Sequence, residues 1–242
     1  MKSLSLLAAG AAFGMALAVP ASAEDTPGNR YNLMPRLYHS EVSVSEAYLL
    51  TNHDRGNVAK NDFANAVLID VRTIAEYVAG HPPGAYSIPF PHIAGSPSEP
   101  NDATDYIGYD VSVDPDVSMG AVNDGTLPIA SFVEYVEALF PDRNTPILTL
   151  CRTGHRSVMA GNALAKAGYT NVRNIWEGYV GQLKYAYAGG TVADPLVALD
   201  LNNDGAFDDR DKDGWAGFAN LPVSTKLHPE RIFSPYADLY AQ

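Results

Sequence analysis

The chain has 242 residues, about one and a half times the usual length of a domain, which argues against a repeat array and favours one domain with additions. Hydrophobic residues make up 46% and aromatic residues 10% of the chain, which is enough for a packed core and excludes a disordered protein. The formal net charge of -12 repels phosphate backbones, so nucleic acid is not an expected partner.

Residues 1–23 have the features of a signal peptide. Lys2 gives a positive start, residues 4–19 form an apolar run, and Ala21, Ser22 and Ala23 give the small-x-small pattern of a cleavage site. The alternative is an uncleaved membrane anchor. After this segment no run reaches the roughly 20 apolar residues that span a bilayer. We therefore expect a mature chain that begins at Glu24 and is periplasmic or secreted.

The remaining pattern alternates strands with helices. Helical patterns cover residues 43–50, 74–79, 129–140 and 158–168, and strand patterns cover 67–71, 86–89, 147–150 and 172–176. This alternation predicts an α/β fold, with a parallel sheet flanked by helices on both faces.

Cys151 is the only cysteine, so it cannot form an intramolecular disulfide. It lies between a strand end and a helix start, where parallel sheets bind ligands and backbone N–H groups converge on a loop. These donors and the nearby Arg152 and Arg156 favour the thiolate form of the cysteine. We interpret Cys151 as a nucleophile, with a buried, inert cysteine as the alternative.

Three signatures in the chain resemble the rhodanese family. They are residues 67–72 with the turn at 80–89, the loop at 151–156, and the segment 176–178. The resemblance extends over roughly residues 43–184. It implies a five-stranded parallel sheet flanked by helices and sulfane-sulfur transfer through a Cys151 persulfide, with no cofactor for catalysis. A small anionic donor such as thiosulfate would supply the sulfur, and a thiol or cyanide would accept it.

The resemblance also implies roles for neighbouring residues. The expected substrate-binding residues are Arg152, Thr153, Gly154, His155 and Arg156, with Arg152 and Arg156 as cations for the donor. The charged trio Asp70, Arg72 and Glu76 is interpreted as a structural salt-bridged corner.

Two other functions are weighed against sulfur transfer. Phosphatases and arsenate reductases use a longer loop in which five residues separate the cysteine from the arginine, whereas four separate Cys151 from Arg156. The other alternative is a rhodanese-like module that only binds partners, although such modules often lack the loop cysteine, which is present here.

Two regions lie outside a minimal domain of this kind. Within the domain at residues 24–188, a long insertion at about 91–128 is rich in Pro, Gly and Asp, and it is either an ordered wall of the pocket or a surface loop. Residues 189–242 form an irregular C-terminal extension. Neither region identifies a protein partner.

The extension contains an acidic segment that resembles an EF-hand calcium loop. The candidate ligands are Asp200, Asn202, Asp204, the Ala206 carbonyl and Asp211. The twelfth position is Asp where Glu is usual, and an overlapping acidic register begins at Asp209. We expect a structural Ca²⁺ at this loop, with a solvated acidic turn as the alternative. The histidines show no zinc-ligand spacing.

Overall fold

The structure is a computed structural model, and it describes residues 36–51, 66–93, 127 and 129–241. The expected signal peptide and nearly all of the insertion, residues 94–126 and 128, lie outside these described residues. The predictions for those two segments therefore remain predictions.

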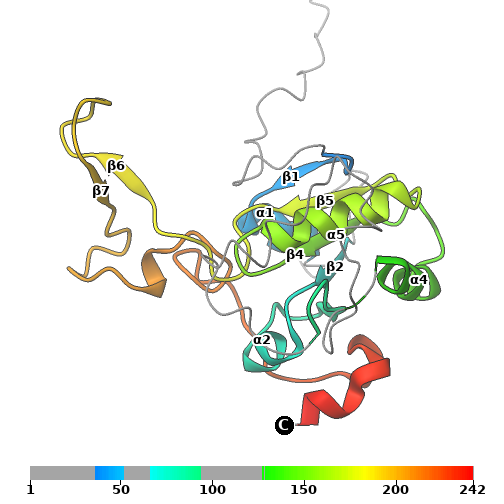
Figure 1. The fold of residues 1–242 in the computed structure, drawn as a ribbon. Coiled ribbons are helices and arrows are strands. Elements are labelled where there is room, and N and C mark those ends of the chain that lie inside the picture. Colours follow the sequence, from blue (N-terminus) through cyan, green and yellow to red (C-terminus); the bar gives the residue numbers. More distant parts are fainter. Residues whose placement is uncertain (1–35, 52–65, 94–126, 128, 242) are drawn as a thin grey trace, which may run out of the picture.

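A parallel sheet of five strands forms the centre of the molecule (Figure 1). Its strands are β1 (Ser40–Val42), β2 (Val67–Asp70), β3 (Tyr86–Ser87), β4 (Ile147–Leu150) and β5 (Val172–Ile175), in the order β1-β5-β4-β2-β3. The predicted α/β fold with a parallel sheet flanked by helices is confirmed. Strand β1 has only three residues and no alternating pattern, and the sequence analysis missed it.

Among the described residues, four helices accompany the sheet: α1 (Val44–Thr51), α2 (Ile74–Ala79), α4 (Ile129–Leu139) and α5 (His155–Lys166). Capping boxes start two of them. Ser43 and Glu46 exchange hydrogen bonds at α1, and Thr73 and Glu76 do so at α2. All four were predicted to within three residues at their starts, because their apolar residues recur at helical spacing.

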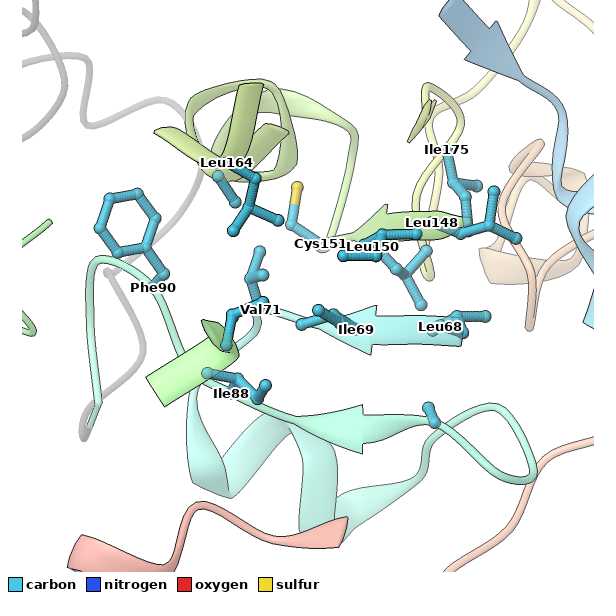
Figure 2. Packing of buried hydrophobic residues seen from close by; sticks show 14 of the residues in the cluster. Leu68, Ile69, Val71, Ile88, Phe90, Leu148, Leu150, Cys151, Leu164 and Ile175 are labelled. Carbon is cyan, nitrogen blue, oxygen red and sulfur yellow. The ribbon is translucent and has the colours of Figure 1, made fainter. Parts of the chain in front are cut away.

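Strand β4 lies in the middle of the sheet, between β2 and β5, and all four of its residues are buried. Leu148 and Leu150 lie along this strand, and Cys151 follows directly at its carboxyl end (Figure 2). Val71 and Ile88 extend the same apolar core beyond the ends of β2 and β3. The sheet thus places Cys151 at the edge where parallel sheets bind ligands.

The C-terminal extension packs into the same core. It contains the hairpin strands β6 (Tyr185–Tyr187) and β7 (Leu196–Ala198) and the short 3₁₀ helices η1 (Asp209–Asp211), η2 (Pro229–Arg231) and η3 (Ser234–Ala241). Trp215, Phe233 and Tyr240 of the extension are buried in the core cluster. The Tyr240 hydroxyl donates to Ser87 Oγ over 2.7 Å, which ties the chain end to β3. The hairpin instead projects away from the sheet (Figure 1).

None of the helices in the part of the chain described above is both long and apolar enough to cross a bilayer.

Candidate active site

The sulfur of Cys151 lies among hydrogen-bond donors. The Gly154 N–H donates to Sγ over 3.1 Å, and the Ser157 hydroxyl donates to it over 3.3 Å. Cys151 is 1% exposed and Ser157 is fully buried. Donors in a site that excludes water stabilise a negative charge on sulfur more strongly than donors in solvent.

Gly154 is required for the shape of this loop. Its φ is +96°, and a Cβ at this position would lie 2.2 Å from the carbonyl oxygen of Trp176. The left-handed turn lets α5 begin at His155, three residues earlier than its apolar pattern predicts. No side-chain hydrogen bond caps α5, and the positive end of its dipole adjoins the loop.

A second layer of backbone supports the loop from behind. The N–H groups of Tyr179 and Val180 donate to the carbonyls of Cys151 and Arg152 over 2.8 and 2.9 Å. A third layer comes from the extension, where Trp215 N–H donates to the Gly178 carbonyl over 3.0 Å. The extension therefore supports the loop that carries the cysteine.

Arg156 forms a buried ion pair with Glu76. Its two terminal nitrogens donate to the two carboxylate oxygens of Glu76 over 2.9 and 3.0 Å, and its side chain is 3% exposed. Burial raises the pKa of Glu76, but the Arg156 charge and hydrogen bonds, the Arg72 charge and the Thr73 N–H outweigh it and lower the pKa to about 2. Arg156 thus binds Glu76 in this geometry, and its expected contact with the sulfur donor stays a prediction. Arg156 fixes α5 to α2.

Within the predicted corner of Asp70, Arg72 and Glu76, Asp70 and Arg72 form a direct ion pair, and the Arg72 charge lowers the pKa of Glu76. Arg72 forms a buried ion pair with Asp70 at 2.7 Å, donates to the Gly80 carbonyl over 2.7 Å and lies 3.7 Å above the ring centre of Tyr179. Glu76 is hydrogen-bonded to Arg156 instead. Proximity in the sequence suggested the trio, but the direction of the Glu76 side chain was set by a cation 80 residues away.

The other loop residues differ in burial and charge. Arg152 is half-buried, and its contact with an anionic donor stays a prediction. Thr153 is buried. Burial, together with the Arg156 charge, lowers the pKa of His155 to about 4, which keeps this imidazole neutral at neutral pH.

Comparison with known proteins agrees with this geometry. Residues 47–184, more than half of the chain, match the rhodanese-like domain family. The chain belongs to that family. The rhodanese-like domain here is also 30% identical, over 112 residues, to the senescence-associated protein DIN1 of Raphanus sativus. That match covers 46% of this chain and 45% of DIN1, so the chain spans less than half of this relative.

Several solved structures are also similar, at low identity. The human single-domain sulfurtransferase TSTD1 is 22% identical, with a TM-score of 0.30 over 57% of this chain and 90% of that protein. The rhodanese-like domain of Anabaena Alr3790 is 15% identical, with a TM-score of 0.33 over 72% of this chain and 88% of that domain. Rv0390 from M. tuberculosis is 21% identical, with a TM-score of 0.38 over 78% of this chain and 99% of that protein.

The acidic segment of this rhodanese-like protein forms a loop held by its own hydrogen bonds. Asp200 accepts the Gly205 N–H over 2.7 Å, and the fully buried Asp211 accepts the Leu201 and Asp208 N–H groups over 2.8 and 3.0 Å. Arg210 forms an ion pair with Asp204. Within the described residues, no three His, Cys, Asp or Glu side chains form a group that could hold a metal. The loop with Asn202 and Ala206 thus shows no assembled calcium cage, and calcium remains a prediction.

Two contributors to the site of this rhodanese-like domain were missed from the sequence. Ser157 directly follows the loop. Its hydroxyl, six positions after Cys151, could have been predicted from the sequence as a second hydrogen-bond donor to the sulfur. Trp215 lies 64 positions beyond the cysteine, in an irregular segment, and no local pattern linked it to the loop.

Proposed function

We propose that this rhodanese-like domain is an exported sulfurtransferase that carries a sulfane sulfur on Cys151. The observation that supports it best is the Cys151 sulfur held by the Gly154 N–H and the Ser157 hydroxyl beside the uncapped start of α5. A thiolate needs such donors to persist, and a persulfide needs them for its terminal sulfur.

The reaction proceeds in two displacements at sulfur. The Cys151 thiolate attacks the outer sulfur of thiosulfate, an S–S bond forms, and the original S–S bond breaks as sulfite leaves with the electron pair. Cyanide or a thiolate then attacks the outer sulfur of the persulfide and releases the Cys151 thiolate. Arg152 is the cation proposed to attract the donor dianion. Neither leaving group needs a proton, which is consistent with a neutral His155.

Phosphoryl or arsenate chemistry fits the site less well. A tetrahedral oxyanion over the sulfur needs a guanidinium directed into the loop. Both terminal nitrogens of Arg156 donate instead to the Glu76 carboxylate. A module that only binds partners stays the second candidate, because the cradle of donors would hold a persulfide without turning it over.

A thiosulfate-to-cyanide assay on the mature protein tests the proposal. The wild type should form thiocyanate, and the Cys151→Ala variant should not, although the two proteins have the same melting temperature. Mass spectrometry after thiosulfate treatment should show the gain of one sulfur atom in the wild type alone. Sulfur loading without turnover would favour the carrier module, and neither loading nor turnover would refute sulfur chemistry.

Export is proposed from the signal-like residues 1–23 alone. N-terminal sequencing of the protein produced in a Gram-negative host should find Glu24 as the first residue, in the periplasmic fraction. An uncleaved chain in the membrane fraction would contradict this.

A further inference from the structure

The hairpin of β6 and β7 carries apolar side chains that nothing in the described chain covers. Tyr185 is 58% exposed and Leu196 is 60% exposed, and Val192 and Val197 are exposed as well. The hairpin projects from the body as an arm, which we define as residues 184–199 (Figure 1). A two-stranded hairpin alone is at most marginally stable in water, so an exposed apolar one indicates a missing neighbour.

The hydrogen bonds of the arm show which polar groups are left for that neighbour. Leu199 N–H donates to the Lys184 carbonyl and Ala188 N–H to the Pro195 carbonyl, both over 2.9 Å. In an antiparallel ladder, hydrogen-bonded pairs alternate with pairs whose polar groups face outward. The N–H and C=O groups of Leu196 and Ala198 therefore point away from β6, along the outer edge of β7.

The two edges of the hairpin differ in what they can still bind. On the β6 edge, the Tyr187 carbonyl already accepts the Gly190 N–H over 2.9 Å. On the β7 edge, no described residue takes the outward groups of Leu196 and Ala198. The β7 edge is thus the one ready to accept another strand.

We infer that the outer edge of β7 pairs with the same edge of a second copy of this chain. An antiparallel pairing about a two-fold axis at Val197 places Leu196 opposite Ala198 of the partner strand, and Ala198 opposite the partner's Leu196. Each of these pairs exchanges both of its outward hydrogen bonds, so the edge is complementary to itself. The two hairpins then form one four-stranded antiparallel sheet.

The low charge of the arm permits a second copy at this place. The chain carries a net charge of -12, so two copies repel each other over most of their surfaces. Residues 185–199 contain a single charged side chain, Asp194, whose carboxylate accepts the Thr191 N–H and hydroxyl. The arm is therefore a place where two acidic copies can meet with little repulsion. An edge contact of this size is well below a standard interface, so the dimer is expected to be weak.

Single-cysteine crosslinking tests the register. In the Cys151→Ser background, Val197→Cys places two thiols across the two-fold axis in a non-hydrogen-bonded pair, with Cα atoms about 4.5 Å apart, which suits a disulfide. Val192→Cys is the matched control, because Val192 is 83% exposed on the same arm but lies away from the axis. Oxidation should give a covalent dimer for Val197→Cys and little for Val192→Cys. Equal crosslinking of both would overturn the register.

Sedimentation velocity over a range of concentrations tests the dimer itself. The wild type and Val192→Lys should show concentration-dependent dimers. Val197→Lys sets two like charges directly opposite each other and should raise the dimer Kd about tenfold or more. A wild type that stays monomeric at every concentration, or that is monomeric and binds an extended apolar peptide, would overturn the inference. These outcomes are independent of thiocyanate formation, so they leave the proposed chemistry unaffected.

Discussion

The pair of Glu76 and Arg156 links the helix after the cysteine loop to α2, and its strength can be measured with a near-isosteric change. Glu76→Gln keeps the capping box with Thr73, because Gln also serves at this position, but removes the charge that faces Arg156. The shift of the Glu76 pKa from 4.5 to about 2 corresponds to about 3 kcal/mol. The side chain is only 14% exposed, so solvent screens little of this.

We therefore expect Glu76→Gln to lower the free energy of unfolding by about 3 kcal/mol at pH 7. Glu46→Gln is the matched control, since Glu46 occupies the same position in the exposed capping box of α1, and it should cost less than about 0.5 kcal/mol. Urea titrations followed by tryptophan fluorescence provide both values.

The pH dependence of the free energy of unfolding tests the contribution of Glu76. Because the pKa of Glu76 is lower in the folded than in the unfolded state, its contribution is present above pH 4.5 and is lost as the pH falls towards 2. The stability difference between wild type and Glu76→Gln should shrink over that range. Equal losses for the two Gln variants, or a difference that does not change with pH, would refute the reasoning.

Four further predictions concern the loop and the extension. Arg152→Ala should lower kcat/KM for thiosulfate by about ten- to a hundredfold, because the dianion loses a charged hydrogen bond; unchanged kinetics would mean that Arg152 points elsewhere. Gly154→Ala should abolish turnover and should destabilise the fold more than Gly190→Ala. Both glycines have positive φ, but of the two only a Cβ on Gly154 would lie within 2.2 Å of a backbone oxygen. Equal urea midpoints for the two variants would contradict this. The His155 ring should titrate near pH 4 when followed by NMR. The free energy of unfolding should fall as the pH drops from 6.5 towards 4, because only the unfolded state takes up a proton at His155 in this range. A titration midpoint near 6.5 would show that the ring is exposed. If the acidic loop binds Ca²⁺, the melting temperature should be higher in millimolar calcium than in chelator, and Asp200→Ala should remove this difference. Identical melting temperatures in calcium and in chelator would show that the loop is a solvated acidic turn.

The sequence predicted those parts of the fold that local patterns encode. Helix α2 was predicted at its observed bounds, and the structure adds the capping box of Thr73 and Glu76 at its start. The loop at Cys151 was found because a buried strand ends there. Helix α5 was expected to start too late, because its first residues are polar and carry no apolar period.

Contacts between segments far apart in the chain could not be predicted from the sequence. Arg156 was assigned to the substrate because it is near Cys151 in the sequence, whereas its guanidinium binds Glu76. The extension was separated from the domain at residue 188, and the structure buries Trp215 against Tyr48 of α1. Neither contact has a local signature, because side-chain direction and long-range packing are set only in the folded chain.

The backbone hydrogen bonds behind the cysteine loop also affect the order in which the site can fold. Synthesis delivers the chain from its N-terminus, so the loop at Cys151 is made before the strip around Trp215, whose N–H groups bind the backbone behind that loop. Until that strip arrives, the carbonyls of Gly178 and Tyr179 lack the N–H groups that fix them. An incomplete chain should therefore have a loosely held cysteine, and a fragment cut at residue 184, where the family match ends, should remain in that state. The backbone support behind Cys151 is therefore completed only after the rest of the rhodanese-like domain has been made.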